Sequence, residues 1–284
     1  MNAERTIRRT KTSDIPELMG IFAAAKKVMR ADGNLTQWAG NYPSEDVILL
    51  DMKRKASFVI VEDGKIAGTF AFVPGREPTY RRIYKGRWLD DKCPYGTIHR
   101  IAAAPGFTGI FADAVEWCWE TLPNIRVDTH RDNNIMRHVI ASEGFTYCGI
   151  IYLQDGAERL AFQKIADVER LRKDARLVLP ARTRSLAERF GVTPNKIFIK
   201  HNRSNWGSCS TKGNINLNLN LMRLPSHLRD YVILHELAHL REMNHGAHFH
   251  EILESMCVDV LGSEFHQRPL HRFLGSSLRR YYLV

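Results

Sequence analysis

The stretch at residues 231–250, which reads YVILHELAHLREMNHGAHFH, constrains the fold and the chemistry of this chain more than any other stretch. It contains an H-E-x-x-H motif, with His235 and His239 on an apolar run of residues that favour a helix. Residues four apart in an α-helix lie about 40° apart around its axis, so both imidazoles face the same side. Two neutral ring nitrogens at this spacing fit one face of a tetrahedral zinc ion, and Glu236 lies where a general base can reach a metal-bound water. The stretch therefore predicts a catalytic zinc site on a helix.

A third protein ligand must come from outside the motif, and three histidines follow shortly downstream: His245, His248 and His250. A continuous helix would rotate His245 about 240° away from His239, onto the wrong face. Asn244 and Gly246 flank His245, and both residue types tolerate the left-handed conformation that ends helices. We therefore predict a helix end near Met243 and a turn that returns His245 to the metal, with His248 as the second choice. Three protein ligands leave one coordination position open, as in a catalytic zinc site.

The length of the chain, 284 residues, predicts two domains, and 44% hydrophobic with 25% charged residues is the balance of a globular protein. No run of about 18 apolar residues occurs, and no apolar stretch follows the basic residues of the N-terminal MNAERTIRRTKTSDI. We therefore expect no transmembrane helix, no signal peptide and no membrane partner. The five cysteines are scattered and form no C-x-x-C motif, which favours reduced thiols in a cytoplasmic protein.

The positive charge is concentrated in the second half of the chain. Residues 1–165 contain 23 Lys+Arg against 20 Asp+Glu, a net charge of +3, and residues 166–284 contain 18 against 11, a net charge of +7. A basic excess can attract nucleic acid or another polyanion. Because these basic residues are dispersed and are not interleaved with aromatic residues, we favour a solvated face over a nucleic-acid groove.

The first half alternates predicted strands and helices in the order β-α-α-β-β-β-α-β-α-β-β, which describes a mixed α/β domain. The predicted strands are residues 6–9, 57–62, 65–73, 95–103, 125–129, 145–150 and 159–164. Asp63-Gly64 is a hairpin signal between the second and third strands. We place the domain boundary near Ala166, which gives domains at residues 1–165 and 166–284.

This order, with RIAAAPGFTGIFADAVEWC at residues 100–118 and the later DTHRDNN and EGFTYCGI, resembles the GNAT acetyltransferase superfamily over residues 4–165. The resemblance implies that acetyl-CoA is the cofactor and an amine is the acetyl acceptor. It also implies that backbone N–H groups in a glycine-containing turn at a helix N-terminus hold the pyrophosphate of the cofactor, which agrees with the positive end of the helix dipole. The residues implied in cofactor binding are Ile101, Ala103, Gly106, Thr108, Gly109, Ile110 and Asn134.

The chain departs from the GNAT pattern in two places. The usual Arg/Gln-x-x-Gly-x-Gly/Ala turn is reduced to PGFTGI at residues 105–110. The tyrosine that in this family protonates the leaving thiolate would fall at Ile140. Tyr147, His99 and Asp128, near the ends of the central predicted strands, are substitute candidates for the catalytic role, and Tyr147 is our choice among them.

In the second half, a predicted helix begins near Ala166, is kinked or restarted at Pro180 and stops at Gly191. Residues 196–200 alternate as in a strand, and residues 215–221 alternate strictly between Ile or Leu and Asn, as in a half-buried strand. The blocks NWGSCSTKGNINLNLNLMRLP and DYVILHELAHLREMNHGAHF resemble the YgjP-like and SprT-like metallopeptidases over residues 170–257. The resemblance implies a zincin-like α+β domain, in which a small antiparallel sheet packs on the active-site helix. It also implies His235, His239 and His245 as metal ligands and Glu236 as the base.

The first of these two blocks leaves two alternatives open. Cys209 is either a fourth zinc ligand or, as we favour, a buried small residue in a turn. The asparagines Asn216, Asn218 and Asn220 either hydrogen-bond an extended peptide or form a solvated strand face. The family usually reads Arg-Trp-Gly-Ser-Cys, whereas this chain has Asn205 in place of that arginine and Arg203 two residues earlier.

Together these features predict a bifunctional protein with an acetyl-CoA-dependent N-acetyltransferase domain and a zinc-dependent hydrolase domain that acts on a peptide or a small molecule. The alternative is a CoA-binding domain without turnover, which regulates or targets a hydrolase that cleaves peptide or nucleotide phosphoanhydride bonds.

Overall fold

The computed structural model describes residues 5–283 and divides into two compact units, Met1–Ile165 and Ala166–Val284. The first four residues of the first predicted domain and the last residue of the second lie outside the described residues. Among the helices of residues 5–283, none combines the length and the apolar character needed to cross a membrane.

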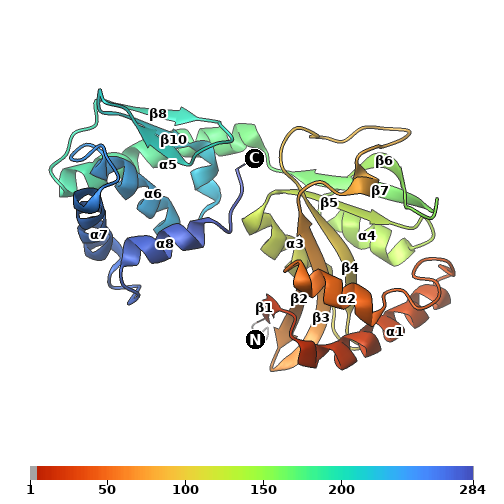
Figure 1. The fold of residues 1–284 in the computed structure, drawn as a ribbon. Coiled ribbons are helices and arrows are strands. Elements are labelled where there is room, and N and C mark those ends of the chain that lie inside the picture. The colour runs from red at the N-terminus through yellow and green to blue at the C-terminus, as the bar shows by residue number, and fades with distance from the viewer. Residues whose placement is uncertain (1–4, 284) are drawn as a thin grey trace. The chain divides into compact units, whose positions relative to one another are not determined.

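The first unit is built on one seven-stranded sheet (Figure 1). Its strands are β1 (Arg5–Arg9), β2 (Ser57–Glu62), β3 (Lys65–Pro74), β4 (Gly96–Ala103), β5 (Asn124–Thr129), β6 (Thr146–Tyr152) and β7 (Glu158–Ile165). Its helices are α1 (Ile15–Ala31), α2 (Glu45–Lys53), α3 (Ile110–Thr121) and α4 (Asn134–Ser142), with short 3-10 turns at η1 (Thr12–Asp14) and η2 (Pro78–Tyr80). The strand order is β1-β2-β3-β4-β5-β7-β6, and only β4 and β5 are parallel neighbours. The predicted mixed α/β fold is confirmed.

Helices cover both faces of this sheet, because successive residues of a strand point to opposite sides. Val59 of β2 is buried in a cluster with residues of α1 and α2. Its neighbour Phe58 packs on the other face, where its ring lies 4.5 Å from that of Trp117 in α3. The sheet is therefore a layer between α1 and α2 on one side and α3 on the other.

The two central strands separate after a short paired stretch. β4 and β5 pair only from Gly96 to Ile98 and from Ile125 to Val127, whereas β4 continues along β3 and β5 continues along β7. From His99 and Asp128 onward the two strands no longer pair with each other, so the sheet has an opening at this point.

The second unit packs helices around a small three-stranded sheet (Figure 1). Its strands are β8 (Lys196–Lys200), β9 (Gly207–Cys209) and β10 (Asn214–Asn218). Its helices are α5 (Val168–Arg189), α6 (Ser226–Ala238), α7 (Ala247–Leu261) and α8 (Leu270–Leu278), with a 3-10 turn η3 (Leu219–Arg223). The order is β8-β10-β9, and β10 is parallel to β8 but antiparallel to β9. The expectation of an antiparallel sheet was wrong for β8.

The asparagine-rich strand is shorter than its alternation predicts. β10 ends at Asn218, because the side chain of Asn218 accepts hydrogen bonds from the backbone and the side chain of Asn220 and starts η3. Asn218 and Asn220 are both buried, so neither forms a solvated face or a peptide-binding edge. Asn216 instead donates to the hydroxyl of Ser208 in β9. Competition from side-chain hydrogen bonds ends the strand early.

α6 lies at the centre of the second unit, since it packs on β9, β10, α5, α7 and α8. Eight of its thirteen residues are buried. A helix that is buried around most of its circumference is rigid and excludes water, which suits a helix that positions side chains.

Candidate functional site

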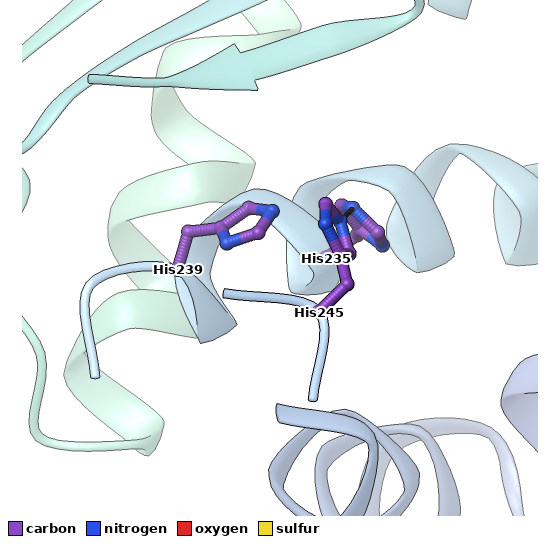
Figure 2. A group of neighbouring side chains, drawn as sticks. All are labelled: His235, His239 and His245. Atoms are coloured by element: carbon purple, nitrogen blue, oxygen red, sulfur yellow. Dashed lines mark hydrogen bonds between the residues drawn. The ribbon is translucent and has the colours of Figure 1, made fainter. Parts of the chain in front are cut away.

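Three histidines converge at the end of α6. His235 lies on the last turn, and His239 caps the helix, which ends at Ala238 and not near Met243 as predicted. The loop between α6 and α7 then returns His245 to the same place. One ring nitrogen of each histidine lies within 4.8 Å of the others, and the Nε2 atoms of His235 and His245 are 3.1 Å apart (Figure 2). The structure thus brings together the three residues that the motif spacing singled out as metal ligands.

A single aromatic side chain supports all three imidazoles from one side. Phe249, in the first turn of α7, is fully buried, and its ring centre lies 5.0 Å from that of His235, 4.5 Å from that of His239 and 4.7 Å from that of His245. The apolar contact orients the rings and keeps water from one side of the cluster.

The environment favours the neutral form of His235 and His239, which metal ligation requires. Burial, with the neighbouring histidines, lowers the pKa of His235 to about 4. Burial also lowers the pKa of His239. The Nδ1–H group of His239 donates to the backbone oxygen of Glu242, 3.1 Å away, which leaves its Nε2 lone pair free for a metal.

Glu236 faces the small sheet and not the solvent. Its side chain is 5% exposed, and burial raises its pKa to about 8. The backbone of Gly207 in β9 passes directly over it, because a Cβ atom at Gly207 would lie 2.7 Å from Glu236 Oε1 and 2.8 Å from its Cγ. The glycine of the sequence NWGSC is therefore required by the close approach of a strand to the carboxylate.

The donor set fits zinc, since three neutral imidazole nitrogens with an open side form a common catalytic zinc arrangement. Within residues 5–283, these three histidines are the one group of three or more metal-ligating side chains close enough to hold an ion together. His248 is not part of it, and its exposed ring lies 3.8 Å from Glu251. Cys209 is not part of it either, and its half-buried thiol donates to the backbone oxygen of Ser210 at 3.6 Å.

In the first unit, the predicted cofactor turn lies between β4 and α3. Gly106 and Gly109 both have positive φ, +87° and +77°, and Gly109 is the N-cap of α3. No side chain caps this helix, so the first N–H groups of α3 remain available to an anion. The remaining residues of the expected set lie on β4, in the turn and at the starts of α3 and α4: Ile101, Ala103, Thr108, Ile110 and Asn134.

At the opening between β4 and β5, the structure assembles a buried polar cluster. The Tyr80 hydroxyl donates to Asp128 Oδ1 at 2.5 Å, and the ring of Tyr80 meets the ring of His99 edge to face. Glu77 Oε2 lies 3.8 Å from His99 Nε2. Burial raises the pKa values of Glu77 and Asp128 and lowers that of His99 to about 3. This cluster can bind an ammonium group and accept its proton.

The structure separates Tyr147 from this cluster. Tyr147 lies on β6 opposite Phe162 of β7, which in turn lies opposite Val127 of β5, so two strands separate Tyr147 from β4. Its side chain is half exposed and lines a shallow cavity with residues of α4, on the face opposite Asp128. Ile140 is fully buried in α4.

Sequence reasoning missed Tyr80 and Glu77. Both lie at η2 in the long segment between β3 and β4, where no periodicity or motif marks them. The only sequence signal was the unusual density of aromatic and charged residues in that segment.

Comparison with known families finds one match, which spans most of the second unit and the last two strands of the first. A family model described as the YgjP-like metallopeptidase domain matches residues 146–263, beginning in β6 of the first unit. No curated protein matches the chain.

Solved structures resemble the first unit. An acetyltransferase of the GNAT family from Streptococcus agalactiae is 32% identical, with a TM-score of 0.53, over 58% of this chain and 99% of that chain. Another GNAT-family acetyltransferase, from Listeria monocytogenes, is 16% identical, with a TM-score of 0.43, over 58% of this chain and 98% of that chain. The GNAT fold and the YgjP-like match together confirm the resemblances that the sequence motifs indicated. The chain therefore belongs to the GNAT acetyltransferase family and fuses to that fold a YgjP-like metallopeptidase domain.

Proposed function

We propose that this protein is a bifunctional cytoplasmic enzyme with a peptide hydrolase site in the second unit and an N-acetyltransferase site in the first. The observation that supports the hydrolase most directly is the convergence of His235, His239 and His245, with the buried Glu236 next to His235 in the chain. The five free thiols agree with a reducing compartment.

His235, His239 and His245 would hold the zinc, and a bound zinc ion polarises a carbonyl group and acidifies water. The Glu236 carboxylate would accept a proton from the attacking water and later pass it to the leaving amine. A carboxylate in a dry site is a stronger base than one in water, because burial favours its protonated form. Gly207 keeps the carboxylate in place by close contact.

The exposed edge of β9 favours an extended peptide as the substrate. β9 pairs only with β10 among the described strands. Trp206 and Ser210 turn their backbone groups to β10, so by alternation the groups of Gly207 and Cys209 point away from it. A peptide can add to this edge directly above Glu236.

The test is zinc content together with peptide cleavage. We expect about one zinc per wild-type chain, loss of that zinc in His235→Ala, and retained zinc without cleavage in Glu236→Gln. Cleavage that survives in Glu236→Gln, or a wild-type chain that takes up no zinc, would contradict the proposal. Hydrolysis of nucleoside triphosphates, assayed in parallel, tests the alternative substrate class.

For the first unit, we propose acetyl transfer from acetyl-CoA to an amine at the opening between β4 and β5. The likeness to the GNAT-family acetyltransferase and the uncapped N-terminus of α3 support the cofactor site. Glu77 and Asp128 would bind the ammonium form of the acceptor and take its proton, which leaves the neutral amine to attack.

An acetylation assay over a panel of amines tests this site. We expect Asp128→Asn to lower turnover at least tenfold while acetyl-CoA binding, measured by calorimetry, is retained. Binding of acetyl-CoA by the wild-type chain without acetylation of any amine would support the alternative of a CoA-binding domain that lacks turnover.

A further inference from the structure

A second pair of histidines, His250 and His271, lies where α7 packs on α8. It is close to the triad of His235, His239 and His245. His250 and Glu254 are one turn apart on α7, and His271 is the second residue of α8. His271 is 7% exposed, and its ring centre is 5.2 Å from that of His250. Phe249 separates this pair from the triad, with its ring 5.5 Å from that of His250.

Glu254 fixes the proton of His271. Its carboxylate accepts from the backbone N–H groups of Leu270 and His271, both at 2.8 Å, and from His271 Nδ1 at 2.7 Å. Burial alone would raise the pKa of Glu254, but these hydrogen bonds outweigh burial and lower it. The ionised carboxylate therefore holds the proton of His271 on Nδ1 and leaves a lone pair on Nε2.

Two buried nitrogens in this group have no hydrogen-bond partner, His271 Nε2 and His250 Nδ1. A buried polar atom without a partner is costly, so two such atoms on neighbouring rings indicate a missing occupant. A carboxylate behind a histidine with a free Nε2 is the arrangement that orients imidazoles toward metals.

The ring separation matches a shared metal ion. With a zinc–nitrogen distance of about 2.0–2.1 Å, about 1.1 Å from nitrogen to ring centre and a tetrahedral angle, two ligating rings have centres about 5.2 Å apart. The pairs within the triad are separated by 5.0 Å, 5.2 Å and 4.6 Å. The 5.2 Å between His250 and His271 falls in the same range.

We infer that His271 Nε2 and His250 Nδ1 bind a second divalent transition-metal ion of the zinc class, separate from the ion of the triad. The partly exposed side of His250 admits the water that completes the coordination. With two protein ligands, this site binds more weakly than the three-histidine site.

Titration of the metal-free full chain with Co²⁺, followed by visible absorption and calorimetry, tests this inference. We expect two binding events in the wild type, the second weaker than the first. His250→Phe and His271→Phe should lose the second event and keep the first, and His235→Ala should keep the second. Glu254→Gln should weaken the second event by about 10- to 100-fold, because it releases the orientation of His271.

His248→Ala is the matched control, since His248 is an exposed histidine on the same helix, and it should keep both events. Thermal unfolding of each variant identifies any that is not folded. If His271→Phe fails to fold, His250→Phe still tests the inference, because His250 is partly exposed and its replacement disturbs the core less. A single event in the wild type up to millimolar Co²⁺ would overturn the inference, because the pair would then hold a water or a direct N–H···N hydrogen bond. A second event that persists in His250→Phe would overturn it as well. Because His235→Ala isolates this site, failure of the proposed hydrolase would not be mistaken for failure of the second site.

Discussion

Replacing Gly207 with alanine tests whether the close approach of β9 positions the catalytic carboxylate. The new Cβ atom would lie 2.7 Å from Glu236 Oε1, 2.8 Å from Cγ and 3.0 Å from Cδ. Ordinary contacts between such atoms begin near 3.4 Å, so the carboxylate must move by about 0.7 Å or the strand must lift by as much. A misplacement of about 1 Å at a catalytic group costs up to about 100-fold in rate, and overpacking of a buried site costs about 1–3 kcal/mol.

We expect Gly207→Ala to lower kcat for peptide cleavage by about 10- to 100-fold while the zinc content stays near one per chain. Urea unfolding should show a loss of about 1–3 kcal/mol. Gly246→Ala is the matched control, since this glycine follows His245 directly, has φ −77° and would place its Cβ in open space. Wild-type turnover and stability in Gly207→Ala, with Glu236→Gln inactive, would refute the claim that Gly207 sets the position of the carboxylate.

Three further predictions concern other parts of the chain. Gly86→Ala should destabilise the first unit by about 3 kcal/mol in urea unfolding, because its Cβ would lie 2.0 Å from the backbone oxygen of Cys148. The hydrogen bond from Arg8 lowers the pKa of Asp14, so Asp14 stabilises the fold above its unfolded pKa near 3.8 and loses that effect as pH falls through its lower folded pKa. Asp14→Asn should therefore cost up to about 1 kcal/mol at pH 5–8 and almost nothing near pH 2, and a constant difference across this range would contradict the pairing. Removing zinc with a chelator should lower the melting temperature of the wild type, since free zinc at about 1,000 times Kd contributes about 4 kcal/mol, and the decrease should be much smaller in His235→Ala, which lacks the three-histidine site.

Motif spacing predicted that His235 and His239 lie together because helix geometry is local. Residues four apart always share a face, so His235 and His239 needed no tertiary information. The end of α6 did need it. Between His239 and Met243 the sequence has no glycine or proline, yet the helix stops at Ala238, where Arg241 donates to the backbone oxygen of Phe190. Such a long-range contact has no signature in the local pattern.

The polar clusters lay beyond the reach of sequence patterns for the same reason. Tyr80 and Asp128 are 48 residues apart and meet only because η2 folds over the sheet. Glu254 and His271 are 17 residues apart, across a loop and a change of helix. The alternation of asparagines, in contrast, predicted a longer strand than exists, because side-chain hydrogen bonds outcompeted the ladder at Asn218.

The short pairing of β4 with β5 divides the large sheet into two parts, β1-β2-β3-β4 and β5-β7-β6. Three residue pairs join these parts. Each part has its own ladders, which bulges interrupt in places, whereas the residues of β4 beyond Ile98 do not pair with β5. Local unfolding begins at the weakest set of hydrogen bonds, so we expect these two parts of the sheet to be the units of partial unfolding in this fold. A molecule that inserts a peptide-like arm between β4 and β5 would supply hydrogen-bond partners to both strands and join the two parts of the sheet. Amide hydrogen exchange in β4 and β5 would then slow on binding. The exchange rate of these strands therefore reports whether the opening between them is occupied.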